Sequence, residues 1–119
     1  MINVKDEVYA ALLSVTDNVT DSYPKDWEKD LAIQYMEEDN NVFEHTGNVE
    51  RKSYVRYRID VWHNKSTSLA AVMVDEALST LGLLRTLCKD VDDPSGRKHK
   101  QMRYEMVIDV ETGQVYHNM

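Results

Sequence analysis

Three charged residues in the first half of the chain have types and an order that could support metal-dependent hydrolysis. Asp39 is followed by Glu50 and, two positions later, by Lys52. Two carboxylates at such positions can hold a divalent metal, and the lysine can polarise the attacking water. Carboxylates are so abundant in this chain that such a match arises readily by chance, and a solvated hairpin end explains these residues better. A small metal-dependent nuclease is therefore kept as the alternative function.

Other patterns of catalysis or metal binding are weak in this sequence. No pair of histidines has the spacing of zinc ligands, and a structural zinc site also needs cysteines that the chain lacks. There is no glycine-rich phosphate loop and no nucleophile elbow. Cys88 has apolar neighbours and no identifiable base beside it, so we expect a small buried thiol. We predict no catalytic residue, metal or cofactor, and strand-end or tail positions for the histidines, which are His45, His63, His99 and His117.

The stretch "VERKSYVRYRIDVWHNK", residues 49–65, alternates between apolar and polar side chains. This period of two predicts a strand with one buried and one exposed face. The exposed face could stack single-stranded nucleic acid, be ordinary surface, or contact a protein. Interfaces are enriched in arginine and aromatic residues, which favours the third interpretation. The predicted interface residues are Lys52, Tyr54, Arg56, Arg58 and Trp62.

The first half of the chain must supply a helix and the partner of this strand. An apolar stripe predicts a helix over 3–15 that Asn3 can cap. A polar connection interrupted by Pro24 follows, with a short strand expected around 19–23. "LAIQYMEE", residues 31–38, alternates as a strand does. "DNNVFEHTGN", residues 39–48, has turn composition, so we expect it to link this strand to the one at 49–65 as a long hairpin.

The second half predicts a central helix followed by strands. Residues 67–81 are apolar on much of the helix circumference, including Met73 and Leu78, and Gly82 can end the helix. Strands are expected at 83–90, 99–110 and 115–117. The inner face of the second of these strands comprises Met102, Tyr104, Met106, Ile108 and Val110. The predicted fold is α+β: one domain over 1–119, with a mainly antiparallel sheet and two main helices packed on it.

Charge and length narrow the functional classes. A chain of 119 residues forms one domain, and its net charge of −7 argues against general affinity for nucleic acid. Residues 1–50 have a balance of −9 and residues 51–119 one of +2, which suits head-to-tail association of copies. No apolar run approaches a membrane span, and no segment has the pattern of a signal peptide. A single cysteine fits a reducing compartment.

The order of elements resembles that of the tail-completion or tail terminator proteins of long-tailed bacteriophages. It is carried by a first amphipathic helix, a strand ending "YRIDVW", the helix "AAVMVDEALSTLGL", then "LCKDVDD" and the strand "MRYEMVIDV". The resemblance implies a hexameric ring at the head-proximal end of the tail tube that stops tube polymerisation. It further implies tail tube and head connector proteins as partners, DNA passing through the ring, and a place in the virion after assembly in the host cytoplasm. It implies no catalytic residue.

Overall fold

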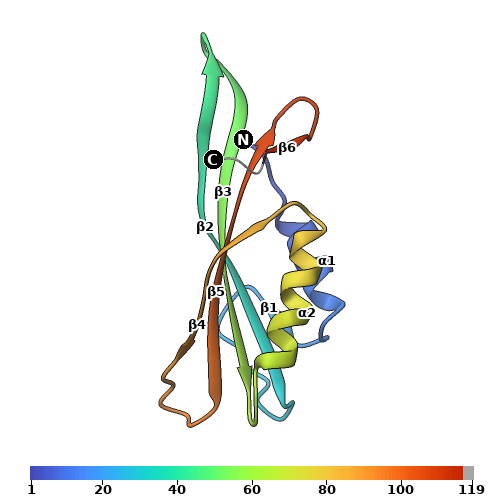
Figure 1. Cartoon of the computed structure of the whole chain (residues 1–119), viewed down its shortest axis with the longest axis vertical. Coiled ribbons are helices and arrows are strands. Elements are labelled where there is room, and N and C mark those ends of the chain that lie inside the picture. The colour runs from blue at the N-terminus through green and yellow to red at the C-terminus, as the bar shows by residue number, and fades with distance from the viewer. Residues whose placement is uncertain (117–119) are drawn as a thin grey trace.

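A long, twisted sheet runs the length of the molecule, which is 51 Å long and 22 Å wide (Figure 1). The computed structural model describes residues 1–116, so His117 and the predicted end of the last strand lie outside the described residues. Neither helix has the length and apolar character needed to cross a bilayer, within that range. The elements are α1 (Lys5–Leu13), β1 (Val19–Thr20), β2 (Leu31–Thr46), β3 (Val49–His63), α2 (Ser68–Ser79), β4 (Leu84–Val91), β5 (Lys98–Asp109) and β6 (Val115–Tyr116).

The sheet has the strand order β1-β2-β3-β5-β4. β1 is parallel to β2, and the remaining pairs are antiparallel. β6 pairs with Val107 and Ile108 of β5, further along the edge of β5 on which β4 lies. These observations confirm the predicted single α+β domain with a mainly antiparallel sheet.

Both helices cover the same face of the sheet, and the core lies between them and the strands (Figure 1). Tyr57 and Tyr104 are fully buried there, and each hydroxyl has a partner: Tyr57 donates to Glu37 at 3.0 Å and Tyr104 to Asp75 at 2.8 Å. Burial, with these carboxylate contacts, raises the pKa of both tyrosines. The predicted inner face of β5 is confirmed at Met102, Tyr104, Met106 and Ile108, while Val110 is only partly buried.

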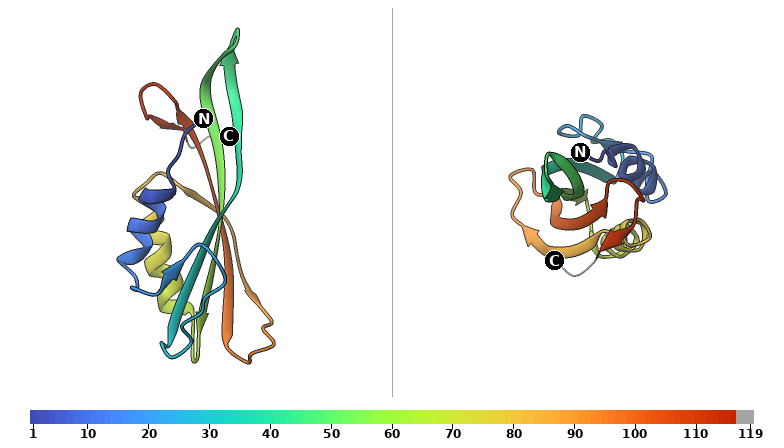
Figure 2. Two further views of the ribbon diagram at one scale, coloured as in Figure 1. Left: turned by 180° about the vertical axis from the view of Figure 1, so that it is seen from behind. Right: turned by 90° about the horizontal axis from the view of Figure 1, so that it is seen from above.

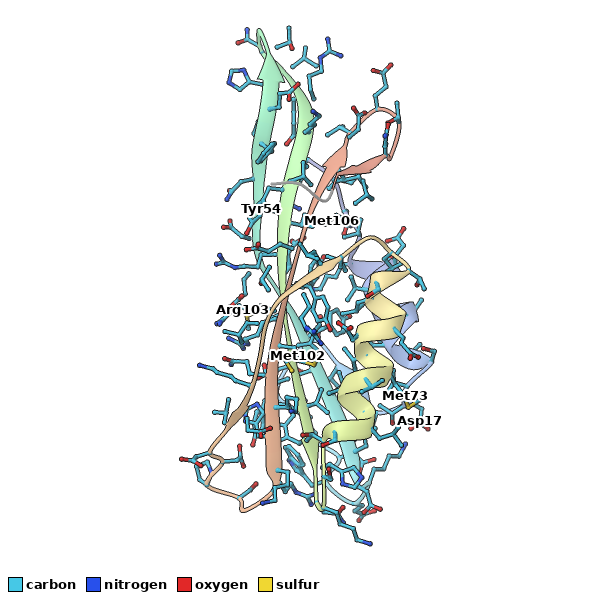
Figure 3. All side chains as sticks on the ribbon, viewed as in Figure 1. Asp17, Tyr54, Met73, Met102, Arg103 and Met106 are labelled. Atoms are coloured by element: carbon cyan, nitrogen blue, oxygen red, sulfur yellow. The ribbon has the colours of Figure 1, made fainter. Side chains whose placement is uncertain are left out.

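Two residues predicted to be buried are instead exposed. Met73 is on the outer side of α2 with 37% of its surface exposed, whereas Leu78 is fully buried (Figure 3). The helix is apolar around much of its circumference, so the sequence alone did not define its inner face. Cys88 is exposed because β4 is an outermost strand of the sheet.

The predicted hairpin between β2 and β3 is confirmed, but its connection over 39–48 is wrong. β2 continues to Thr46, and the turn contains only Gly47 and Asn48. Gly47 has φ of 60°, as the first central residue of a two-residue hairpin turn requires. The ladder between β2 and β3 shifts register three times, and each shift is a β-bulge with one extra residue: Glu38 and Phe43 on β2, and Arg51 on β3. The result is a β2–β3 hairpin arm, residues 40–52, that extends beyond both helices (Figure 2). β5 pairs with β3 as far as Lys52, so only the tip of the arm has two strands alone.

The helix ends are close to the predicted ones. α1 begins at Lys5 and its N-cap is Val4, so the prediction that Asn3 is the cap is wrong. The Asn3 side chain, one residue earlier, accepts a hydrogen bond from the Lys5 backbone N–H at 3.1 Å. Gly82 follows α2 with φ of 90°, the left-handed conformation expected after a helix. A Cβ atom at Gly82 would lie 2.8 Å from Val115, so this position also needs the absence of a side chain.

Candidate interaction surfaces

The predicted basic row lies on the sheet face opposite the helices, which we call the open face. Lys52, Tyr54, Arg56 and Arg58 alternate with buried residues of β3, as the sequence predicted. Their neighbours on β5 are Asp109, Val107, Glu105 and Arg103. Tyr54 and Arg103 lie on the side of the sheet away from α2 (Figure 3).

Glu38 gathers three arginines on the open face. It is the extra residue of a bulge in β2, which turns its carboxylate toward the arginines. Arg103 Nε lies 2.9 Å from Glu38 Oε1, Arg56 Nε lies 3.3 Å from the same oxygen, and Arg58 Nη1 lies 3.8 Å from Oε2. Arg58 also donates to Asp60 at 2.9 Å. The arginines therefore have carboxylate partners within the chain and do not form an unbalanced basic patch.

Burial and neighbouring charges shift the pKa values of Glu38 and Tyr54 on the open face. Burial by itself raises the pKa of Glu38, but the hydrogen bond from Arg103 and the charges of the three arginines outweigh it, and the pKa falls below its usual value. Burial and a 2.5 Å hydrogen bond to Glu105 raise the pKa of Tyr54 to about 12. Glu38 stays ionised and Tyr54 neutral near pH 7, so the cluster is a fixed structural network.

Trp62 is not available to a partner. It is only 3% exposed, so the prediction that it lies on an exposed face is wrong. Its ring stacks on His99 at 4.4 Å and meets Tyr23 and Trp27 of the connection before β2. Its indole N–H donates to Asp93 at 3.1 Å. Segments distant in sequence cover this end of the open face, which no strand pattern could indicate.

The residues of the alternative nuclease site are not brought together. Asp39 pairs with Arg56, and Glu50 lies six positions from Arg56 along β3, which corresponds to about 20 Å of strand. Lys52 instead forms an ion pair with Glu44 at 3.1 Å. Across residues 1–116, no group of three His, Cys, Asp or Glu side chains could hold a metal ion. His99 contacts Asp60 at 2.8 Å, while His45 and His63 bond to the local backbone.

The arm carries a second surface that the sequence did not reveal. Val42, Phe43 and Val49 are each more than half exposed near its tip. The polar residues around Val42 and Phe43 mask strand alternation, so the sequence predicts a turn there. Val49 begins the strand predicted over 49–65 and is nevertheless exposed. Exposed apolar side chains on a projecting element make the arm a candidate surface for a protein partner.

No known protein family and no curated protein sequence matches the chain. The likeness to tail terminator proteins therefore rests on the order of elements alone, and the surfaces described above must carry any functional argument.

Proposed function

We propose that this protein is a structural subunit of the ring at the head-proximal end of the tail tube in a long-tailed bacteriophage. There it stops tube polymerisation and joins the tail to the head. Its partners are copies of itself, most simply in a hexamer, the tail tube protein and the head connector. It acts in the virion at the head-tail junction after assembly in the host cytoplasm, without a cofactor.

The observation that carries this proposal is the arm. β5 pairs with β3 as far as Lys52, so only the tip of the arm beyond this pair is a ribbon of two strands, which is marginally stable in water by itself. The arm also exposes Phe43, with 51% of its surface accessible. Covering such side chains would contribute about 25 cal/mol for each Å² of apolar surface removed from water. A partner protein is the natural cover, as expected for an assembly subunit.

The charge of the chain is compatible with a ring that surrounds DNA. A net charge of −7 and arginines already matched by carboxylates leave little to hold phosphates. Tyr54 and Trp62 do not form a stacking platform for bases, because the first donates to Glu105 and the second is buried. In this proposal DNA passes through the ring and is not bound by these residues.

The test is the variant Phe43→Asp, introduced into the phage that encodes the protein. We expect a folded subunit, because the residue is exposed, together with tails of uncontrolled length or filled heads without tails in electron micrographs. Leu69→Asp, which changes an apolar residue that is 73% exposed on α2, is the matched control. Tails of normal length on normal virions with Phe43→Asp would contradict the proposed role of the arm. Magnesium-dependent plasmid cleavage lost in Glu50→Ala would overturn the structural function itself.

A further inference from the structure

Two edges of the sheet have backbone groups with no strand beside them. β1 pairs only with Ile33 and Gln34 of β2, so β2 has no outer neighbour from Tyr35 to Thr46 among the described residues. On the opposite side of the sheet, β4 pairs with β5 and presents its outer edge over Leu84–Val91. We call these the β2 edge and the β4 edge.

Open edges are templates for strand addition, because each unpaired N–H and C=O can bond to another strand. Natural proteins commonly protect such edges with very short strands, proline, bulges, charged side chains or a covering loop. Bulges interrupt both edges here, at Glu38 and Phe43 of β2 and between Arg85 and Leu87 of β4, so each edge pairs in shorter regular stretches. The β2 edge has 12 residues and the β4 edge has 8, and neither segment contains proline. The two edges lie at opposite ends of the strand order and do not pair with each other in this open sheet.

The two edges differ in charge. β2 contains four acidic residues and no lysine or arginine, although Glu38 and Glu44 have basic partners within the chain. β4 contains Lys89 and Arg85 against Asp90, and Arg85 also pairs with Asp75. Asp39 pairs with Arg56, and Lys89 with Gln101, so both project from the open face. Strands paired along these edges would therefore bring Lys89 to the same face as Asp39, where opposite charges stabilise a cross-strand pair.

We propose that the β2 edge of one copy pairs with the β4 edge of the next, so that the sheet continues from subunit to subunit. This inference rests on the proposed function, because it describes how the ring would be built. The contact is head-to-tail, with unlike patches meeting, and such a contact closes a ring when its rotation allows. Complementary charges set its direction, since two β2 edges would repel each other.

Cross-linking through the natural Cys88 tests the contact. Cys88 is exposed on β4 and is the only cysteine. Cys88 pairs with Met102 and Val42 with Ser53, so both project from the helix-covered face of the sheet. A chain with Val42→Cys and Cys88→Ser is mixed with the parent chain and treated with a short bismaleimide. We expect a 1:1 cross-linked product in the mixture and little product from either chain alone.

The matched control is Glu111→Cys with Cys88→Ser, which moves the exposed thiol away from both edges. Lys89→Glu in the parent chain should lower the yield several-fold, and so should added salt. Homodimers of the Val42→Cys chain, or a mixed product no more abundant than the control, would overturn the inference. Failure here with long tails in the Phe43→Asp phage would leave the proposed function standing. Specific cross-linking together with normal tails in the Phe43→Asp phage would support the edge contact and contradict the proposed role of the arm.

Discussion

Arg103 on β5 reaches across β3 and places its Nε atom 2.9 Å from Oε1 of Glu38 on β2. The two residues are 65 positions apart in sequence. This contact joins three strands on the open face, and Arg56 and Arg58 of the middle strand complete it. The arginines that the sequence offered as a docking surface thus help to hold the sheet together.

Replacing Glu38 by Gln should destabilise the fold. The side chain is only 14% exposed, and its loss leaves three guanidinium groups close together without their shared carboxylate. We expect a loss of about 1–3 kcal/mol in the free energy of unfolding, measured by urea denaturation at pH 7. Glu111→Gln is the control: its side chain is 83% exposed and lies 3.8 Å from Arg51, so the change should be near zero.

The same residue should make stability depend on pH in the acid range. The pKa of Glu38 is lower in the folded chain than its ordinary value of 4.5. Its contribution is therefore complete above that value and is lost as pH falls through the folded pKa. Urea midpoints measured from pH 6 downward should decline less steeply in Glu38→Gln than in the parent. Equal slopes in the two proteins would show that the ion cluster does not form in solution.

The double change of Arg56 and Arg58 to Glu should destabilise the folded subunit. If the two arginines were simply exposed, as the strand pattern alone predicts, replacing each would change the free energy of unfolding by roughly 0 to 1 kcal/mol. The structure instead sets both beside Glu38, so the variant would gather three carboxylates and should lose about 2–4 kcal/mol. Thermal melts of the soluble subunit measure this loss. Arg51→Glu, a change on the exposed arm, should leave the melt almost unchanged.

Two substitutions on α2 should separate its inner and outer sides. Leu78→Asp buries an unpaired charge where the side chain is fully enclosed, and that costs several kcal/mol, on the order of the whole stability of a small domain. Met73→Asp alters a side chain that is 37% exposed, and we expect a folded protein with a modest loss. Circular dichroism and a cooperative melt distinguish the two. A folded Leu78→Asp protein would show that the core is misplaced.

Trp62 should report on its enclosed position by fluorescence. Trp27→Phe leaves Trp62 as the sole tryptophan, and its emission should be shifted to shorter wavelength and resist quenching by acrylamide. Trp62→Phe leaves only the less enclosed Trp27 and removes the hydrogen bond to Asp93, at a cost of about 1 kcal/mol. Strong quenching of Trp62 would mean that this end of the open face is uncovered in solution.

Local patterns in the sequence were sufficient for the elements and the fold class. Period-two alternation over residues 49–65 predicted β3 and its buried side, because the pleat alternates side chains regardless of the surrounding fold. Gly82 marked the end of α2, since a left-handed residue is a backbone requirement that needs no tertiary contact. Fold class followed from the order of these elements.

Only the tertiary structure decided which surfaces are available. Trp62 and Arg58 follow the same alternation, yet one is covered by Tyr23 and Trp27, and the other is matched by Glu38 and Asp60. Residues 39–46 look like a turn by composition, but pairing with β3 extends them as a strand, since each ladder hydrogen bond outweighs weak local preferences. The contacts of Trp62 with Tyr23 and Trp27, and of Arg58 with Glu38, join residues 20 to 39 positions apart, and their partners are set by chain packing, which no local pattern encodes.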